Sequence, residues 1–497
     1  MRGLAQAVAA YRSPTPETVV VAAVALLLAL VISLLEPLWG AILVAGLFVV
    51  LATLVKPEVG LVLTVFAVPF GSVREVPLGA MTVSAAEGLV GLLLFGWIAR
   101  AASRRTLDLS AAPLVWPLGL FLAFAVFSLT TATSLPLALK EVLRWLELTA
   151  VYVVVATSIR GDRIRLLVLT ILAAGLAQAL QGFYQFFMRV GPPSFAIGPF
   201  LRAYGSFEQP NPYAGYLGMV LPFAFAIALL YRSEPCKAVR DFFPLRRWPW
   251  LRLMAYATLG AAVVAMVMSL SRGAWLAGAF ALAVVALASS RRAFLIGTTI
   301  LVVAALVLAV GALNLLPSEI VSRAAKALDS FSIFDVRSAV PTGENWAIFD
   351  RMARWQATWS MFEASPLLGV GIGNYADAYP RYALPGWEEA LGHAHNIYLN
   401  IAAETGIIGL ALYLLLIGSW FWHAGWLLAA LSRQGNRPSG SERAVALGAL
   451  GVLTALAVHN VFDNLYVHSM NVQIGITLGI VSALGAEMRT GNLKERL

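Results

Sequence analysis

Residues 252–292 read RLMAYATLGAAVVAMVMSLSRGAWLAGAFALAVVALASSRR, two apolar blocks joined by a Ser-Arg-Gly connection. The blocks at 252–270 and 274–290 each have the length that a helix needs to cross about 30 Å of hydrocarbon at about 1.5 Å per residue. Strands of a membrane barrel would instead alternate polar and apolar residues over about ten positions. The stretch therefore predicts two membrane-spanning helices, with basic residues at their far ends and Arg272 at their connection.

The rest of the chain repeats this pattern. Of its 497 residues, 60% are hydrophobic and 12% are charged, and the mean hydropathy is +0.80. A water-soluble core cannot hide so much apolar surface. We expect an all-α polytopic membrane protein with about 12–14 transmembrane helices, the first retained rather than cleaved as a signal peptide. The predicted spans are 18–35, 38–54, 59–71, 82–99, 114–132, 139–158, 166–187, 212–231, 252–270, 274–290, 293–312, 397–424, 443–466 and 470–486.

Charge predicts the orientation of these spans. Most of the 35 Lys and Arg residues fall in alternate short connections, which the positive-inside rule assigns to the cytoplasm together with both termini. The +9 formal charge then reflects topology and does not indicate a nucleic-acid partner. The single cysteine, Cys236, excludes an internal disulfide framework and a thiolate-rich metal site.

One long polar segment interrupts the spans. It divides the chain into N-terminal helices (1–312, about eleven), an extracytoplasmic loop subdomain (313–396) and about three C-terminal helices with a cytoplasmic tail (397–497). Within the loop, residues 345–362 place aromatic and methionine side chains at spacings of three and four. This periodicity predicts an amphipathic helix suited to lie on the membrane surface.

The loop ends in GHAHNIYL (392–399), which leads into an apolar span. His393 and His395 are candidate general bases, since an unperturbed imidazole has a pKa of about 6.5. Alternatively, Asn396 caps the following helix and the histidines are merely interfacial. A metal site is the weaker reading, because no carboxylate or cysteine lies nearby in sequence and positions i and i+2 of a helix point apart.

Several arginines fall on the same predicted side. Arg202 precedes a Pro-Asn-Pro turn, and Arg272 lies between two helices. Arginine keeps its charge and presents a planar fork of donors that suits phosphate oxygens. Contact with lipid headgroups is the alternative, and it applies more strongly to Arg351 and Arg354 on the amphipathic helix.

A charged stripe, Lys140, Arg144 and Glu147, starts the sixth predicted span. Charges that enter a bilayer face the bundle interior or a wet cavity. The stripe either lines a cleft or pairs within itself, and pairing is favoured. Asp463 and His468, in the last predicted outer connection, receive no role from the sequence.

Taken in order, four motifs resemble the superfamily of O-antigen ligases and O-antigen polymerases, bacterial envelope glycosyltransferases. The resemblance is strong over about residues 200 to 415. The motifs are Arg202 with Gly205-Ser206-Phe207 and Asn211; Ser271-Arg272-Gly273; Arg351 with Trp355 and Pro366-Leu367-Leu368-Gly369-Val370-Gly371; and His395-Asn396 with Tyr398-Leu399 and Glu404-Thr405-Gly406.

The resemblance implies a lipid-dependent glycosyltransferase (GT-C-like) fold in the bacterial cytoplasmic membrane, with an extracytoplasmic active site. It implies transfer of a glycan from an undecaprenyl diphosphate carrier to a hydroxyl of a lipid core or protein. His395 matches the family's base, and His393 is less securely matched. Arg202, Arg272 and Arg351 match diphosphate-binding positions. No acidic metal motif is evident, so we expect inverting transfer without metal or other cofactor, with membrane lipids as further partners.

Three functions stay open at this point. A ligase and a polymerase share the chemistry, and the well-formed His-Asn segment favours a ligase. A transporter or flippase of lipid-linked sugars would carry interrupted helices and charges near the bilayer midplane. The candidate charges gather instead at one predicted face, which favours chemistry.

Overall fold

A computed structural model describes residues 36–71, 76–78, 81–231, 250–290, 295, 299, 334–338, 340–341, 346–433 and 440–491. The chain forms two compact units, residues 1–60 and 61–497. In the first unit, α3 (Pro37–Val55) is an uncharged helix of 19 residues with proline in its first turn, where a missing N–H costs no hydrogen bond.

The later elements are almost all helical. The helices are α4 (Pro57–Phe70), α5 (Ala85–Arg104), α6 (Val115–Phe127), α7 (Leu135–Ser158), α8 (Asp162–Met188), α9 (Pro210–Leu230), α11 (Trp250–Met268), α12 (Arg272–Ser289), α15 (Trp346–Ala364), α16 (Tyr375–Ala378), α17 (Ile397–Arg433), α18 (Gly440–His459) and α19 (Met470–Arg489). Two antiparallel hairpins accompany them, β1 (Val76–Leu78) with β2 (Met81–Val83) and β3 (Ala196–Ile197) with β4 (Phe200–Leu201).

The structure confirms an all-α polytopic membrane protein. Within the described residues, nine helices are long and apolar enough to cross a membrane. The predicted span 59–71 corresponds to α4, which has only 14 residues. The predicted span 18–35, nearly all of the span 293–312 and Cys236 lie outside the described residues.

Helix α17 differs from its prediction. Its 37 residues extend to Arg433, beyond the predicted end at 424, and Gly406 interrupts them with φ 66° and ψ −170°. Only glycine adopts this backbone conformation at little cost. The predicted single span is therefore two helices joined at a kink.

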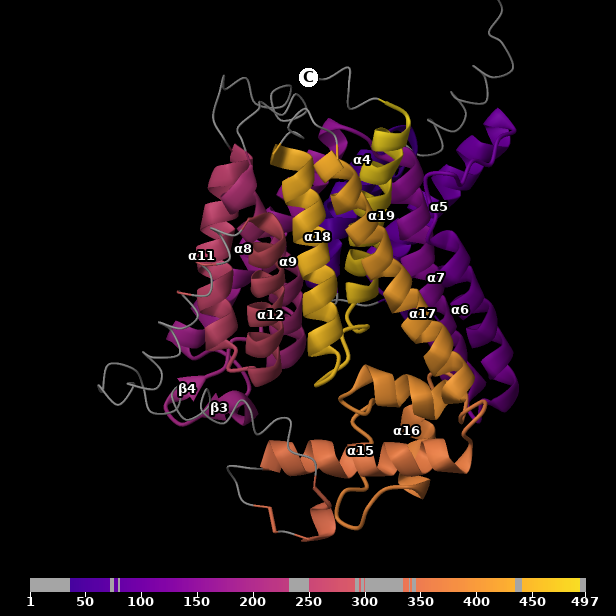
Figure 1. Cartoon of the computed structure of the whole chain (residues 1–497), viewed down its shortest axis with the longest axis vertical. Helices are drawn as coiled ribbons and strands as arrows, with labels where there is room; N and C mark the ends of the chain where they lie inside the picture. The colour runs from indigo at the N-terminus through magenta and orange to yellow at the C-terminus, as the bar shows by residue number, and fades with distance from the viewer. Residues whose placement is uncertain are drawn as a thin grey trace, which may run out of the picture. The chain divides into compact units, whose positions relative to one another are not determined.

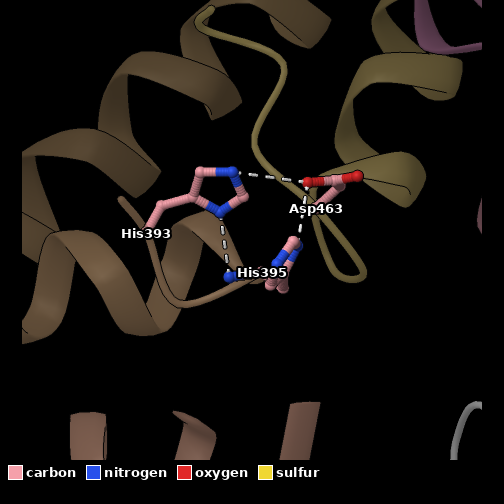
Figure 2. Close-up of side chains that lie close together, drawn as sticks. All are labelled: His393, His395 and Asp463. Carbon is pink, nitrogen blue, oxygen red and sulfur yellow. Dashed lines mark hydrogen bonds and ion pairs between the residues drawn. The ribbon is translucent and has the colours of Figure 1, made fainter. Parts of the chain in front are cut away.

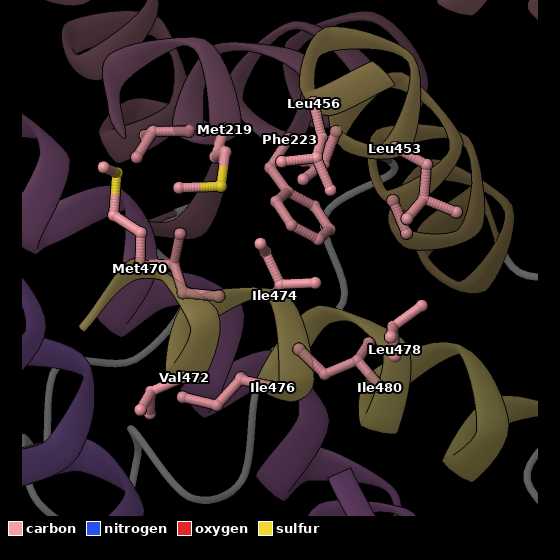
Figure 3. Packing of buried hydrophobic residues seen from close by; sticks show 14 of the residues in the cluster. Met219, Phe223, Leu453, Leu456, Met470, Val472, Ile474, Ile476, Leu478 and Ile480 are labelled. Atoms are coloured by element: carbon pink, nitrogen blue, oxygen red, sulfur yellow. The ribbon is translucent and has the colours of Figure 1, made fainter. Parts of the chain in front are cut away.

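Helix α19 lies at the centre of the second unit, and every residue in its apolar stretch is buried. Gly475 and Gly479 lie four residues apart and let α7 approach closely. A Cβ at these positions would lie 2.4 Å from Val151 Cγ1 and 2.5 Å from Val155 Cβ. Elsewhere on α19, Ile474 lies among apolar side chains of α9 and α18, such as Phe223 (Figure 3). Such close contact is the main source of helix association in a bilayer.

The cap, defined here as residues 334–338, 340–341 and 346–396, is built around α15. Helix α15 runs across the helix ends of the second unit, beside α16 and the start of α17 (Figure 1). The predicted amphipathic helix is present. Phe349 and Met352 of its predicted apolar face are buried inside the cap, whereas Trp346 and Trp359 are exposed. The buried part of this face therefore stabilises the cap itself.

A glycine-rich loop, residues 365–375, fastens the cap to the kink of α17. The kink directs the amide of Ile407 to the carbonyl of Pro366 at 2.8 Å, and the carbonyl of Glu404 accepts the amide of Gly371 at 2.9 Å. The Glu404 carboxylate accepts two further amides of the loop, from Gly373 at 2.9 Å and Tyr375 at 3.0 Å. Glu404 is 4% exposed, so these hydrogen bonds satisfy a carboxylate that water does not reach.

The same loop lies against the chain between α6 and α7. Gly371 has φ +98°, and a Cβ there would lie 2.4 Å from the Cα of Ala132. Asn374 Oδ1 accepts the amide of Ser134 at 2.6 Å. The cap is therefore held to two separate helical segments, and glycine is required where it meets the first.

Gly371→Ala should lower the stability of the protein by more than about 1 kcal/mol, because the new Cβ meets backbone and the φ is unfavourable. The midpoint of thermal unfolding in detergent measures this. Gly386→Ala is the matched control, since Gly386 also has positive φ (+84°) but open space around its Cβ position. An equal shift for both variants would remove the close contact as the cause.

Candidate active site

The segment from His393 to Asn396 is held rigidly at the start of α17. Asn396 Oδ1 accepts the amides of Tyr398 at 3.0 Å and Leu399 at 3.1 Å, so Asn396 caps the helix as the alternative reading predicted. One turn later, Asn400 Oδ1 accepts the amide of Ala394 at 3.0 Å. His395 has φ 52°, a conformation uncommon for a residue other than glycine and frequent at functional sites.

Asp463 approaches this segment from the loop between α18 and α19. Asn460 joins the two parts, because its carbonyl accepts the amide of Ile397 at 2.9 Å and its side-chain oxygen accepts the amide of Leu465 at 3.0 Å. Asp463 itself is 4% exposed. Its position relative to the histidines is therefore fixed by backbone hydrogen bonds on both sides.

Both histidines converge on one carboxylate oxygen (Figure 2). His395 Nδ1 lies 3.2 Å from Asp463 Oδ1, and His393 Nε2 lies 3.7 Å from the same oxygen. The two imidazole rings are 4.4 Å apart and nearly perpendicular. Thus the fold gives the His-x-His motif a buried acidic partner 68 residues away in sequence.

The hydrogen bonds determine where each imidazole carries its proton. An ionised carboxylate only accepts, so His395 Nδ1 is the protonated nitrogen and its Nε2 keeps a lone pair. His393 Nδ1 accepts the amide of His395 at 3.1 Å, so the proton of His393 lies on Nε2, facing Asp463. His395 therefore has a basic nitrogen to offer, whereas His393 does not, because its Nδ1 accepts an amide and its Nε2 carries the proton.

Burial and charge set the ionisation of this cluster. Burial opposes the charged form of Asp463, but the hydrogen bond from His395 and the attraction of the nearby histidines outweigh it and hold the pKa of Asp463 well below its usual range. Burial, together with repulsion from His395, lowers the pKa of His393 to about 4 despite the attraction of Asp463. Near neutral pH, Asp463 is an anion and His393 is neutral.

The same three side chains bear on the question of a metal. Their donor atoms lie within 4.8 Å of one another. Asp463 therefore supplies a carboxylate, and the lack of a carboxylate nearby in sequence was the reason for disfavouring a metal site. A metal ligand must direct a lone pair at the ion, however, and His393 directs a proton at Asp463. The hydrogen bonding fits a proton network better than a metal site.

Arg351 and Arg354 of α15 have different surroundings. Arg354 is 3% exposed, binds Asp350 through Nε (3.1 Å) and Nη2 (3.0 Å), and donates to the carbonyl of Glu389. Arg351 is half-buried and, within the described part of the chain, makes no hydrogen bond. Burial lowers the pKa of Arg351, and the charges of Asp463 and Asp350 partly offset this. An arginine remains protonated nonetheless, so Arg351 is a cation beside the histidine cluster.

Arg202 lies on the loop that joins α8 to α9, and this loop is hydrogen-bonded to the chain just before Arg272. Arg202 donates from Nε to the carbonyl of Ser269 at 2.7 Å and from Nη2 to Asn211 Oδ1 at 2.8 Å. Arg272 is the first residue of α12. The next residue, Gly273, approaches Phe462 so closely that a Cβ would lie 3.1 Å from Phe462 Cβ. Since Phe462 precedes Asp463, the α12 start and the histidine cluster are neighbours.

Residues 257–414 match the family model described as O-antigen ligase. This stretch is similar to the O-antigen ligase family. The resemblance to the O-antigen ligase and polymerase superfamily is thereby confirmed. No curated protein matches the chain.

The O-antigen ligase match includes Arg272, Arg351, His393 and His395, whereas Arg202 and Asp463 lie outside residues 257–414. The residues that the structure brings together therefore lie both inside the matched range and on either side of it. The sequence assigns no role to Asp463, because no spacing rule connects it to a motif 68 residues away.

Two residues of the charged stripe on α7 have partners outside the stripe. Arg144 binds Glu141 at 2.8 Å, and Glu147 accepts a hydrogen bond from Asn471 of α19 at 3.1 Å. The predicted pairing within the stripe is wrong among the described residues, because the partners of Arg144 and Glu147 are Glu141 and Asn471. Lys140 is exposed.

Sequence patterns did not single out the glutamines of α8 that shape the Arg202 loop. Gln185 accepts the amide of Gly205 at 2.7 Å and donates to the carbonyl of the same residue at 2.6 Å. Gln178 binds Ser206 in a similar way, donating to its hydroxyl at 2.8 Å. A polar residue inside an apolar span is the only signal that could have found them.

Arg354→Ala should destabilise the protein by about 2 kcal/mol, because it removes a buried guanidinium with its hydrogen bonds and leaves the partly exposed Asp350 without its counter-charge. Arg351→Ala, on the same helix, should shift the unfolding midpoint far less, since Arg351 has no described hydrogen bond to lose. Thermal unfolding of both variants in detergent makes the comparison. Equal destabilisation would contradict the separate roles of the two arginines.

Proposed function

We propose that the protein is an O-antigen ligase-like glycosyltransferase that moves a glycan from an undecaprenyl diphosphate carrier to an acceptor hydroxyl of a lipid core or protein. The observation that carries this proposal is the His395–Asp463 pair, in which one nitrogen of His395 is held by a carboxylate and the other keeps its lone pair. The family match supports the reaction class.

In the proposed step, His395 acts as the base. The acceptor hydroxyl gives its proton to His395 Nε2 while its oxygen forms a bond to the anomeric carbon of the donor glycan. Asp463 stabilises the imidazolium that results and holds the ring in the correct tautomer. His393 is better suited to positioning, since it is neutral and has no free lone pair: its Nδ1 accepts the amide of His395 and its Nε2 carries the proton.

The arginines would act on the leaving group. As the bond from the anomeric carbon to the phosphate oxygen breaks, the electron pair stays on the diphosphate, whose negative charge increases. Arg351, with its cationic donors beside the cluster, and Arg272, at the neighbouring start of α12, are placed to bind that charge. Arg202 would support Arg272 through its hydrogen bond to Ser269.

This assignment needs no metal, and we propose metal-independent transfer by direct displacement with inversion. Fixed guanidinium groups can take the role that divalent cations play on diphosphate leaving groups. The donor would be lipid-linked, because the proposed site lies outside the cytoplasm of a bacterial inner membrane, where nucleotide sugars are not supplied. Both chain termini would then be cytoplasmic.

A polymerase that joins lipid-linked repeat units would use the same groups. We favour the ligase because the matching family model is described as O-antigen ligase. Electrophoresis of the products separates the two: a ligase attaches the glycan to a new acceptor, whereas a polymerase lengthens the lipid-linked glycan.

His395→Ala should lower transfer from a purified undecaprenyl diphosphate-linked glycan by about 10²- to 10⁴-fold, the usual contribution of a general base. Asp463→Asn should produce a loss of similar order, because an asparagine amide can donate to Nδ1 and shift the proton of His395 to Nε2. Asp335→Asn, an exposed carboxylate of the cap, is the control and should leave the rate unchanged. Full activity of His395→Ala would eliminate the proposed base.

The transfer assay in the presence of EDTA tests the metal-free mechanism, and activity should persist. Activity that disappears with EDTA and returns with a divalent ion would contradict it. In the same assay Arg272→Lys should restore little of the activity that Arg272→Ala loses, since lysine lacks the planar donor fork.

A further inference from the structure

His393, His395 and Asp463 bring three atoms that can bind a metal ion close together (Figure 2). The donor atoms lie within 4.8 Å of one another, and no other three His, Cys, Asp or Glu side chains in the described part of the chain gather in this way. Imidazole nitrogens and a carboxylate oxygen suit zinc, whereas Mg²⁺ and Ca²⁺ prefer oxygen ligands alone. A site of this kind would therefore bind a divalent transition ion.

The distances between these atoms suit zinc. Ligand atoms of a tetrahedral zinc site, each bound at about 2.0–2.2 Å, lie about 3.3–3.6 Å apart. His395 Nδ1 is 3.2 Å from Asp463 Oδ1, and His393 Nε2 is 3.7 Å from the same oxygen. The amide of Asn464 donates to this oxygen at 2.9 Å and holds the carboxylate in place. Small rotations of the two imidazole rings would bring all three atoms to the zinc distances.

The cluster is open to an ion from the solvent. The side chains of His393 and His395 are 20% and 18% exposed, although that of Asp463 is only 5% exposed. The three residues belong to the segment before α17 and to the loop between α18 and α19, not to apolar spans. The ionised Asp463 also gives the three groups a net negative charge that attracts a cation. An ion can therefore reach the buried carboxylate past the two imidazole rings.

Protons occupy these atoms when no ion is bound. His395 Nδ1 directs its proton at Asp463, and a metal at Nδ1 requires that proton to move to Nε2, because a neutral imidazole has one proton and one lone pair. The corresponding shift in His393 costs the hydrogen bond between its Nδ1 and the amide of His395. One such hydrogen bond contributes much less than the coordination of zinc by several protein ligands. An ion that binds imidazole well can therefore displace the protons.

We propose that His393, His395 and Asp463 form an inhibitory binding site for Zn²⁺. Zinc exchanges hydration water for His393 Nε2, His395 Nδ1 and an oxygen of Asp463, and each imidazole keeps one proton, which moves to its other nitrogen. His395 then has no lone pair at Nε2, so it cannot take a proton from an acceptor hydroxyl. Binding of the ion follows from the geometry of the three side chains, whereas inhibition rests on the proposed function.

Cobalt(II), which replaces zinc in such sites and absorbs visible light when it is tetrahedral, measures binding directly. The full chain in detergent, with any polyhistidine tag removed, should bind cobalt in a one-to-one ratio, and Zn²⁺ should displace it. His393→Gln and Asp463→Asn should each weaken the affinity by more than about tenfold, since each removes a direct ligand. Mg²⁺ at the same concentration should displace no cobalt.

His423→Gln is the matched control, because His423 is a buried histidine that binds Ser482 at 3.1 Å and lies outside the cluster. It should bind cobalt as the wild-type protein does. Thermal unfolding without metal shows whether each variant is folded, and His393→Gln should be, since the His393 side chain is partly exposed. Equal cobalt affinity of the wild-type protein and both cluster variants would overturn the site, and so would an equal loss in the two glutamine variants.

The transfer assay tests inhibition. Saturating Zn²⁺ should lower the wild-type rate by about 10²- to 10⁴-fold, the effect of losing a general base, and EDTA should restore the rate. His393→Gln, compared with its own zinc-free rate, should need more than about tenfold more zinc for half-inhibition. An unchanged zinc requirement would instead place the effect of zinc on the diphosphate substrate and overturn the inference.

Failure of this inference differs from failure of the proposed function. If the wild-type protein binds cobalt but transfers no glycan, the proposed function is wrong and the metal site stands. If the wild-type protein transfers glycan at the same rate with and without bound zinc, only the inhibitory role is wrong. Transfer that requires zinc would overturn both the inhibitory role and the metal-independent mechanism.

Discussion

The kink of α17 at Gly406 is the constraint on which the cap and the candidate site depend. A continuous helix would keep its backbone groups for itself. The kink instead releases hydrogen-bonding groups that the glycine-rich loop uses, with the amide of Ile407 bound to Pro366 and the carbonyl of Glu404 bound to Gly371. The buried Glu404 carboxylate adds two further amides of the same loop. The cap is thus attached by directional hydrogen bonds, which specify one arrangement better than apolar contact alone.

From this attachment the position of the histidines follows. Asn400 lies one turn before Glu404 and holds the amide of Ala394 between the two histidines. Asn460 connects this segment to the α18–α19 loop, because it forms hydrogen bonds with both Ile397 and Leu465. Asp463 consequently meets His395 with little freedom on either side. In its proposed role as base, His395 would need no rearrangement before it accepts a proton, which is the advantage of a preorganised site.

Much of the fold was predictable from the sequence, for a simple physical reason. A bilayer requires each spanning segment to satisfy its own backbone, so a long apolar block predicts a helix whatever surrounds it. The blocks at 252–270 and 274–290 correspond to α11 and α12. Arg272 and His395, which the family resemblance singled out, lie within the range that matches the family model. The prediction of one span over 397–424 was wrong at Gly406. A glycine in an apolar run produces a kink only where another segment binds the backbone groups that the kink releases, and the sequence does not show that segment.

What the sequence determined by itself is therefore the membrane class, the helical segments and the residue types capable of the chemistry. Only the tertiary structure decided which of those residues act together. Asp463 is 68 positions from His395, and no helical or strand period relates them, because their contact arises from packing between helices distant in the chain. The structure also distinguishes Arg351 from Arg354, which lie three residues apart on one helix. Arg354 is buried and paired with Asp350, whereas Arg351 is near enough to Asp463 for the charge of that carboxylate to act on it.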